Sequence, residues 1–372
     1  MALRALARVN VAAIERNVAL LRGRLTGGAE LCAVVKADGY GHGAVRSARA
    51  ALAGGASRLA VATVAEAARL RAGEISEPVL VMGAISTEEL PIALQARAEV
   101  VAWSEPFVAD LAAAAAAPVR VHVKLDTGMG RLGTRDVAEA LRVGQAIDAL
   151  PGLQLVGAMT HFATADGDAE FLAHQLAAFD EFAREVRRRH PGVLVHAANS
   201  AATLREPASH FDMVRCGIAI YGCDPMNENP DRYGLEPALE LTSYVAAVKR
   251  ARAGDSAGYG RRFIAQRDTW TATLPIGYAD GVRRALSNNC DVLVGGTRYP
   301  LVGTVSMDNI TIDLGPATSL GPGQPATIIG RDGAQRQTAE DLAQRIGTIN
   351  YEIVCGISGR VPRRYHHDGQ WL

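Results

Sequence analysis

Short apolar runs rich in β-branched residues alternate with alanine-rich segments of helical spacing between Leu31 and Gly222. Such alternation is typical of repeated strand–helix units around a parallel sheet. We count eight apolar runs, and eight is the strand number of a closed (β/α)8 barrel of the TIM type. The predicted strands lie in the runs 31–36, 59–63, 79–83, 99–103, 119–126, 155–162, 193–200 and 213–222.

Helical segments separate these runs. Residues 170–190, for example, carry apolar side chains at helical spacing, and the alanine stretch 112–117 is also predicted to be helical. A doubly wound open sheet is the alternative architecture. We favour the barrel because of the strand count and because each run ends in polar or glycine-rich residues, where barrels build their sites.

The character of the chain changes after Tyr221. The string GCDPMNENPDRYG predicts a linker. Beyond it, short strands alternate with turn dipeptides, and one helix is expected in TAEDLAQRIG. We therefore predict an α/β fold with an N-terminal barrel over residues 10–233 and a mostly β domain over residues 234–372. Residues 1–9 are a candidate extra strand of the second domain.

Charge and cysteine content narrow the class of protein. The chain has 39 positive and 39 negative side chains, interspersed, which argues against a nucleic-acid partner. Its five cysteines lack the paired spacing of metal sites, so we expect no metal and a reduced, cytoplasmic protein. Residues 1–25 include Glu15 and no continuous apolar stretch, which argues against a signal peptide or a membrane segment.

Lysine is rare, because only Lys36, Lys124 and Lys249 occur among 39 basic side chains. Arginine is effectively always protonated, so a retained lysine is a candidate for chemistry that a guanidinium cannot perform. Chance retention is the alternative. Lys36 ends the first predicted strand and precedes DGYGHG, whose glycines allow the backbone to approach a ligand closely.

The carboxyl ends of the predicted strands bring polar side chains to one rim of the barrel. Barrels often hold phosphate in the loops after strands seven and eight, and here those loops contain Ser200 and Gly217. A lysine together with a phosphate site suits pyridoxal phosphate or a phosphosugar, and spacing does not choose between them. The rim residues are Lys36, Lys124, Asp126, His161, Asn199, Ser200 and Arg215.

Seven strings, taken together, resemble the alanine racemases, which are pyridoxal-phosphate enzymes of fold type III. They are AVVKADGYGHG, KLDTGMGRLG, THFATAD, ANSAA, VRCGIAIYG, IGYADG and VSMDN, in this order. The ordered combination is specific, although no single string would suffice. The resemblance implies interconversion of L-alanine and D-alanine, which either supplies D-alanine for peptidoglycan or degrades it.

The resemblance also implies a role for each matching residue. Lys36 would hold pyridoxal phosphate as a Schiff base and act as the base on the D-alanine face, with Tyr259 as the base on the opposite face. Racemisation needs two such groups because the Cα proton leaves from one side and returns from the other. Arg215 would hydrogen-bond the pyridine nitrogen and keep it unprotonated, which makes the cofactor a weaker electron sink.

Further positions match cofactor and substrate contacts of the family. His161 would lie against the cofactor ring, although a buried core histidine is the alternative. The other cofactor contacts would be Tyr40, Asn199, Ser200, Gly217, Ile218 and Tyr221. The substrate would meet Arg131, Met307 and Asp308, with Tyr278, Asp166 and Arg284 supporting its approach.

Two positions merit separate expectations. Lys124 lies seven residues before Arg131, where two bare cations would repel; in many family members the matching lysine is carbamylated, and we expect the same anion here. The string ISGRVPR has Gly359 where many members have a tyrosine. One contact to the phosphate is therefore expected to be missing, and the access path to be wider.

The resemblance implies a homodimer with shared active sites, since Lys36 lies on the predicted barrel and Tyr259 in the β domain. An alternative enzyme is a broad-specificity racemase for serine or basic amino acids, which Gly359 would permit. A non-catalytic pyridoxal-phosphate carrier is less favoured, because a carrier needs neither the second domain nor Tyr259.

Overall fold

The computed structural model describes residues 3–372, so Met1 and Ala2 of the candidate strand 1–9 lie outside the described residues. The chain forms two compact units. One unit is Ile14–Ile220, and the other joins the N-terminal residues up to Ala13 with Tyr221–Leu372. The second unit is therefore built from both ends of the chain.

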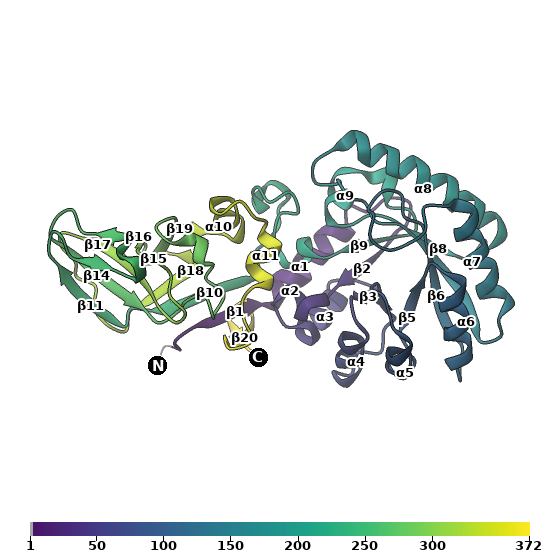
Figure 1. Cartoon of the computed structure of the whole chain (residues 1–372), viewed down its shortest axis with the longest axis horizontal. Helices are drawn as coiled ribbons and strands as arrows, with labels where there is room; N and C mark the ends of the chain where they lie inside the picture. The colour runs from purple at the N-terminus through teal and green to yellow at the C-terminus, as the bar shows by residue number, and fades with distance from the viewer. Residues whose placement is uncertain (1–2) are drawn as a thin grey trace. The chain divides into compact units, whose positions relative to one another are not determined.

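Parallel strands close into a barrel in the first unit, as the apolar runs predicted (Figure 1). The first strand pairs with both the second and the last, which closes the cylinder and excludes the open sheet. The strands of the barrel are β2 (Glu30–Val34), β3 (Arg58–Val61), β4 (Val79–Val81), β5 (Glu99–Ala102), β6 (Val119–Lys124), β7 (Leu153–Met159), β8 (Leu194–His196) and β9 (Met213–Cys216).

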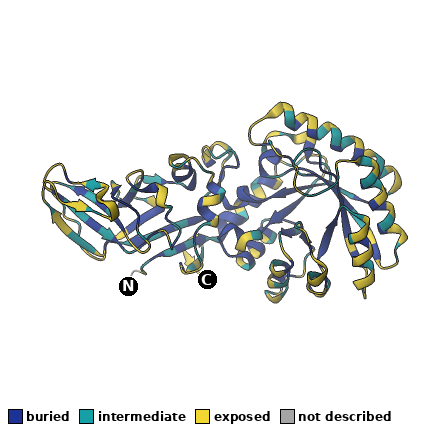
Figure 2. Ribbon diagram, viewed as in Figure 1, coloured by how far each residue is buried: buried dark blue, intermediate teal, exposed yellow. Residues whose placement is uncertain are grey.

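Helices surround the barrel with one face toward the strands and the other toward solvent. Figure 2 shows this as buried strands inside helices whose outer faces are exposed. Among residues 3–372, no helix combines the length and the apolar composition that a membrane crossing requires. The helices are α1 (Val11–Arg22), α3 (Ala44–Ala53), α4 (Val64–Ala72), α5 (Leu90–Gln95), α6 (Glu105–Ala114), α7 (Val137–Ala149), α8 (Ala169–Arg189) and α9 (Ser200–Arg205). The short segment α2 (Lys36–Tyr40) has left-handed rather than helical dihedral angles at Ala37, Asp38 and Gly39.

The alanine stretch 112–117 is only partly helical, so the prediction for it was wrong at its end. Helix α6 ends at Ala114, and Ala115 has an extended backbone with ψ of 116°. Pro118 lies four residues after Ala114, so it has no amide to donate to the Ala114 carbonyl, and its ring would clash with that carbonyl in a continued helix. The proline outweighs the high helix propensity of alanine.

A large sheet forms the second unit. In the described chain, its strand order is β11-β14-β17-β16-β15-β18-β10-β1-β20-β21, with β19 on β18 and a separate β12-β13 pair. Strand β1 pairs antiparallel with β10 and parallel with β20, so the N-terminal segment belongs to this sheet. The strands are β1 (Leu6–Asn10), β10 (Leu239–Tyr244), β11 (Ala247–Ala251), β12 (Ser256–Ala257), β13 (Phe263–Ile264), β14 (Thr269–Leu274), β15 (Asp291–Val294), β16 (Thr297–Val302), β17 (Ile310–Gly315), β18 (Pro325–Asp332), β19 (Gln335–Gln337), β20 (Arg363–His367) and β21 (Gln370–Trp371).

Two helices, rather than the single one predicted, lie between β19 and β20 along the chain. The expected helix is α10 (Ala339–Arg345), but α11 (Asn350–Cys355) also forms, from the apolar string NYEIVC. The first residue of α11 is anchored by tertiary hydrogen bonds, because Asn350 Nδ2 donates to the Asp224 carbonyl (2.7 Å) and to Glu340 Oε1 (2.8 Å). Such contacts override local strand preference.

Candidate active site

Cationic side chains occupy the carboxyl ends of several barrel strands. Lys36 follows β2 by two residues, Lys124 is the last residue of β6, and Arg215 lies in β9. The carboxyl ends of parallel strands share one rim of a barrel, so these three side chains belong to one site. His161 follows β7 by two residues, and its Nδ1 is 3.3 Å from Arg215 Nη2.

The backbone after Lys36 turns in the left-handed sense. Residues 37–40 all have φ between 51° and 64°. Each residue with a Cβ costs about 1–2 kcal/mol in this conformation. The turn is held by hydrogen bonds such as that from the Gly43 amide to the Asp38 carbonyl (2.7 Å). Strained backbone of this kind clusters at ligand sites, which agrees with the placement of Lys36 at its start.

Tyr40 and Gly217 approach each other so closely that only glycine fits at position 217. A Cβ there would lie 2.3 Å from Tyr40 Oη. The Gly217 amide donates to Ser200 Oγ (3.0 Å), and Ser200 begins α9 after Asn199 caps it by accepting from the Ala202 amide (3.0 Å). Hydroxyls and backbone amides gathered in this way are the groups that bind phosphate.

Arg215 is buried, and both of its terminal nitrogens are hydrogen-bonded. Nη1 donates to His196 Nδ1 (2.7 Å), and Nη2 donates to the carbonyls of Thr160 (2.7 Å) and Ala197 (2.9 Å). Within residues 3–372, the third donor, Nε, is buried and has no hydrogen-bond partner. An unmade bond of a buried donor costs about 1–3 kcal/mol. Arg215 Nε therefore remains available to an acceptor that the described chain does not supply.

The cations around His161 and Lys124 control their protonation. Burial, followed by the charges of Arg215 and Arg131, holds the pKa of His161 well below its ordinary value. Its ring is neutral at pH 7, and Nδ1 accepts from Arg215. Burial and the same two arginines lower the pKa of Lys124 to about 8, although Asp126 opposes them. The amine of Lys124 is thus far more nucleophilic near neutrality than an ordinary lysine.

The loop after β6 wraps around the carboxylate of Asp126. This carboxylate accepts from the amides of Gly128 (3.0 Å) and Gly130 (3.0 Å). Burial acts to raise the pKa of Asp126, but these bonds outweigh it and the pKa is lowered. Arg131 comes next and is exposed, as is Asp166 in the loop after β7. The hydrogen bonds to Asp126 therefore order the loop, and the exposed side chain of Arg131 is available to bind an anion.

Two predicted motifs, IGYADG and VSMDN, lie side by side in the second unit. The Tyr278 amide donates to the Ser306 carbonyl (3.0 Å), and the Ala279 amide donates to the Met307 carbonyl (3.0 Å). Asp280 is fully buried, and its carboxylate accepts from a nearby amide (2.8 Å). The backbone is thus fixed, while the side chains of Tyr278 and Met307 are 43% and 51% exposed.

Tyr259 has the most exposed side chain of the predicted catalytic residues, at 74%. Thr304 Oγ1 donates to the Tyr259 carbonyl (2.7 Å), which attaches this turn to the segment leading to Met307. Asp308, which accepts from a guanidinium, and Arg284 are exposed as well. The second unit therefore presents its predicted site residues at the surface.

Known proteins match this chain over nearly its whole length. Models of the alanine racemase N-terminal and C-terminal domains match residues 9–225 and 238–365. The alanine racemase of Geobacillus kaustophilus (strain HTA426) is 42% identical over 363 residues, which cover 95% of this chain and 92% of that relative. The chain belongs to the alanine racemase family.

Solved structures agree with this assignment. Alanine racemase from the D-cycloserine producer Streptomyces lavendulae has a TM-score of 0.93 and 37% identity, and the match covers 98% of both chains. A crystal structure of alanine racemase from Bacillus anthracis with bound L-Ala-P has a TM-score of 0.92 and 36% identity, covering 99% of this chain and 96% of that chain. The resemblance read from the seven motifs is confirmed, and so is the barrel followed by a mostly β unit.

The positions matched to the family divide between the two units. Ile218 and Tyr221, the ends of the short turn η3 (Ile218–Tyr221), are fully buried. The barrel unit carries Lys36, Tyr40, Lys124, Arg131, His161, Asp166, Asn199, Ser200, Arg215, Gly217 and Ile218, and the second unit carries Tyr221, Tyr259, Tyr278, Arg284, Met307 and Asp308.

Sequence reasoning missed the buried side chains behind Arg215. His196 contacts Arg215 directly, and His122 contacts His196 in turn. A signal was present, because VRVHVK and VLVH each place a histidine inside an apolar strand run. A buried imidazole needs hydrogen-bond partners, so two such residues in one barrel are candidates for a joint network.

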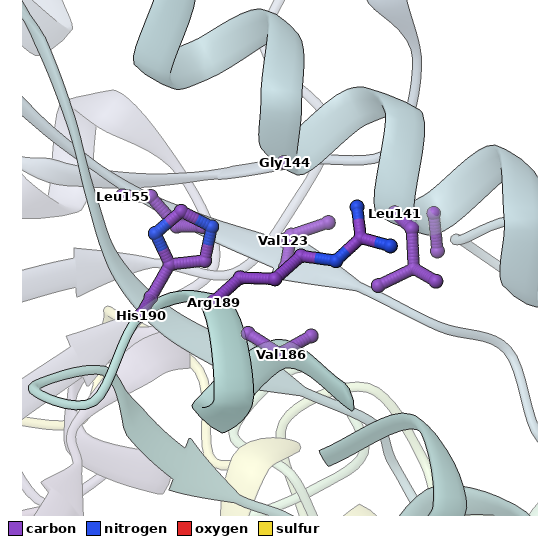
Figure 3. A pocket seen from close by; sticks show the side chains of 8 residues that line it. Val123, Leu141, Gly144, Leu155, Val186, Arg189 and His190 are labelled. Atoms are coloured by element: carbon purple, nitrogen blue, oxygen red, sulfur yellow. The ribbon is translucent and has the colours of Figure 1, made fainter. Parts of the chain in front are cut away.

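A separate void in the barrel unit is too small to compete as a cofactor site. It lies between β6, β7 and the helices α7 and α8, and Figure 3 shows Arg189 and His190 in its wall. Its volume is about 10 Å³. A single water needs roughly that much space.

Proposed function

We propose that this protein interconverts L-alanine and D-alanine, with pyridoxal phosphate held at Lys36. Membership of the alanine racemase family supports the reaction. The observation that carries the cofactor is the buried Nε of Arg215, which has no partner in residues 3–372. An unprotonated pyridine nitrogen is an acceptor of the kind this donor lacks.

The residues of the barrel unit fit pyridoxal phosphate. Lys36 offers an amine for the aldehyde, and Tyr40, Ser200 and the backbone near Gly217 offer donors for the phosphate. Arg215 would donate to the ring nitrogen without giving up its proton, so the nitrogen stays uncharged. The remaining contacts would come from His161, Asn199 and Ile218 of the barrel unit, and from Tyr221, which follows Ile220 in the chain.

Bound pyridoxal phosphate supplies the electron sink that makes the Cα proton of an amino acid acidic. The side chains move that proton. Lys36 Nζ takes or returns it on the D-alanine face, and Tyr259 Oη does so on the other face. Arg131 and the backbone of Met307 bind the substrate carboxylate, which fixes the orientation of Cα between the two bases. Asp308, Tyr278, Asp166 and Arg284 line the approach.

The active form would be a homodimer with shared sites, in which Tyr259 of one copy serves the Lys36 site of another. The exposed side chains of Tyr259, Tyr278 and Met307 support this arrangement, because apolar side chains held at the surface mark interaction sites. The closed point symmetry of most homodimers would then complete two identical sites at once.

Lys124 would carry a carbamate that holds Arg131. The ammonium first loses one proton, and the neutral amine then attacks carbon dioxide and releases a second proton, so that a cation becomes an anion. The lowered pKa of Lys124, about 8, supports this step because the neutral amine is available near neutrality. With ¹³C-labelled bicarbonate, we expect a carbamate carbon signal in the intact protein and none in Lys124→Arg. An unmodified amine in the wild type contradicts the proposal.

Optical rotation tests the central reaction. Purified protein is incubated with pyridoxal phosphate and L-alanine, and the rotation should decay to zero because the two enantiomers have equal free energy. Unchanged rotation with cofactor bound would refute the proposed function.

A broader amino-acid racemase is a second candidate, favoured by Gly359. This residue is exposed, and a Cβ built on it would meet nothing within 4 Å among the described atoms. Turnover of L-serine, L-lysine and L-alanine by the wild type and by Gly359→Tyr separates the two candidates. A broad enzyme predicts comparable rates that narrow toward alanine in the variant. A dedicated alanine racemase predicts little turnover of the other two in either protein.

A further inference from the structure

Four buried side chains connect the amino-terminal end of β5 with Arg215 at the rim. Glu99 Oε2 lies 2.9 Å from His122 Nε2, His122 Nδ1 lies 2.9 Å from His196 Nε2, and His196 Nδ1 lies 2.7 Å from Arg215 Nη1. None of the four is more than 2% exposed. The four side chains, called here the Glu99–Arg215 chain, therefore form one continuous series of hydrogen bonds through the barrel interior.

Gly157 makes the middle link of the Glu99–Arg215 chain possible. His122 is on β6 and His196 on β8, and β7 lies between these strands. A Cβ on Gly157 of β7 would lie 1.9 Å from His122 Nδ1. Only glycine at this position leaves space for His122 to reach across the intervening strand.

The hydrogen-bonding capacities of the four groups allow one arrangement of protons. A guanidinium only donates, so His196 Nδ1 must accept and its proton must sit on Nε2. His122 Nδ1 then accepts from His196, and the proton of His122 sits on Nε2 and is donated to Glu99. Burial lowers the pKa of both histidines, so both rings are neutral at pH 7.

Glu99 is anchored as the acceptor at the far end. Arg58 Nη1 (3.0 Å) and Arg120 Nε (2.6 Å) both donate to Oε1, which leaves Oε2 for His122. Burial acts to raise the pKa of Glu99, but the bond from His122 and the arginines outweigh it and lower the pKa to about 2. Glu99 is thus ionised at pH 7 and acts only as an acceptor.

We propose that Glu99 is a positioning residue for Arg215, acting through the tautomers of His122 and His196. The carboxylate determines which nitrogen of each ring carries a proton, and the resulting bare His196 Nδ1 holds Arg215 Nη1. Because the guanidinium is planar, fixing Nη1 and Nη2 also fixes the direction of Nε. This inference rests on the proposed function, in which Nε donates to the ring nitrogen of the cofactor.

The tautomers can be measured directly in the intact, cofactor-loaded wild type. Long-range ¹H–¹⁵N NMR of histidine-labelled protein distinguishes protonated from bare ring nitrogens, and the variants His122→Gln and His196→Gln assign the two signals. We expect both rings to be neutral at pH 7, with the proton on Nε2. A proton on Nδ1 of either ring, or a doubly protonated ring, overturns the proposal, and neither result depends on racemisation.

Glu99→Gln tests the influence of the carboxylate. The new amide cannot turn its NH₂ toward Arg58 and Arg120, since donors would face donors, so the NH₂ faces His122. His122 must then accept at Nε2, and both rings shift their protons to Nδ1, where the proton of His196 opposes Arg215. We expect this tautomer shift, together with a rate loss of about 10- to 100-fold and a KM for L-alanine changed less than about twofold.

Glu340→Gln provides the control, because it changes an equally buried carboxylate that lies outside the Glu99–Arg215 chain. It should leave the tautomers and the rate unchanged. Wild-type tautomers and rate in folded Glu99→Gln would overturn the proposal. Failure of Glu99→Gln to fold would leave the wild-type tautomer measurement as the deciding one. If wild type does not racemise alanine, the proposed function fails while the tautomers can still be read.

Discussion

The barrel unit and the second unit hold their site residues in opposite ways. In the barrel unit, Arg215 and Lys124 are 2% and 4% exposed, and Arg215 is fixed by several side-chain hydrogen bonds. In the second unit, Tyr259 and Met307 are 74% and 51% exposed, and their backbone carbonyls accept hydrogen bonds that fix the backbone.

The difference implies that the two units prepare their residues for catalysis in different ways. Burial shifts the pKa values of barrel residues and fixes their orientation before any ligand binds. The exposed residues have fixed positions but acquire their surroundings from another surface, which we propose is a second copy of the chain. Substitutions in the barrel unit should therefore affect cofactor binding and stability, whereas those in the second unit should affect turnover alone.

Lys36→Ala should cause the largest loss of activity of the substitutions in the barrel unit. Loss of the cofactor linkage and of one base together should lower racemisation more than about 10⁴-fold. The rate is followed by optical rotation, and cofactor retention by visible absorbance after gel filtration. Lys249→Ala, which removes an exposed lysine of β11, should match the wild type. Equal rates in the two variants would argue against any role for Lys36.

Tyr259→Phe should remove the contribution of the second unit to catalysis and leave the barrel unit unchanged. We expect a rate loss of about 10²- to 10⁴-fold, because one acid–base group is removed, with cofactor binding and Tm unchanged since the side chain is exposed. Tyr299→Phe, a half-buried tyrosine of β16, is the matched control. A lowered Tm in Tyr259→Phe alone would indicate a structural role instead.

Mixing the two variant subunits tests whether residues of the barrel unit and of the second unit act together across two copies of the chain. If Tyr259 of one copy serves Lys36 of another, reassociating equal amounts of Lys36→Ala and Tyr259→Phe should restore about a quarter of wild-type activity. Half of the dimers are then mixed, and each mixed dimer has one intact site. No recovery after verified subunit exchange would count against shared sites.

Acid should destabilise the barrel unit before the second unit. Burial lowers the pKa of His122, His161 and His196, so the unfolded chain binds more protons than the folded chain below pH 6.5. The free energy of unfolding should therefore fall as pH drops through that value, by at most about 4 kcal/mol per pH unit for three groups.

Hydrogen exchange between pH 7.5 and 5.5, corrected for intrinsic rates, provides the measurement. The barrel strands should lose protection first, since His366 is the described histidine with a lowered pKa in the second unit and it is only partly buried. Parallel loss in both units would contradict the assignment of neutral histidines to the barrel.

The smallest expected effect comes from comparing alanine substitutions at two glycines, one in each unit. Gly217→Ala places a Cβ 2.3 Å from Tyr40 Oη, and overpacking of this kind costs about 1–3 kcal/mol. We expect a lower Tm and roughly tenfold weaker binding of pyridoxal phosphate, measured by fluorescence titration. Gly359→Ala meets nothing within 4 Å and should change neither quantity. Identical behaviour of the two variants would remove the steric argument.

Much of the barrel could be predicted from local patterns. Each apolar run overlaps one strand of the closed barrel, because strands covered on both faces are continuously apolar. The predictions failed where distant residues or a proline decided the backbone. Pro118 ends the alanine helix early, and Asn350 anchors a helix in a string that reads as a strand.

The candidate site could be predicted only in part from such local patterns. Lys36, Lys124 and Arg215 stood out because the strand ends of a barrel share one rim. The left-handed turn over residues 37–40 was not predicted, because non-glycine residues rarely adopt that conformation and local propensity argues against it.

The sequence by itself determined the family, the order of the strands and the chemistry available at the rim, since motifs and periodicity are local properties of a chain. Only the tertiary structure decided which side chains control that chemistry. The Glu99–Arg215 chain joins residues 19 to 74 positions apart, and its middle link needs the missing side chain of Gly157. Proton positions and buried pKa values depend on such non-local contacts, which no local pattern encodes.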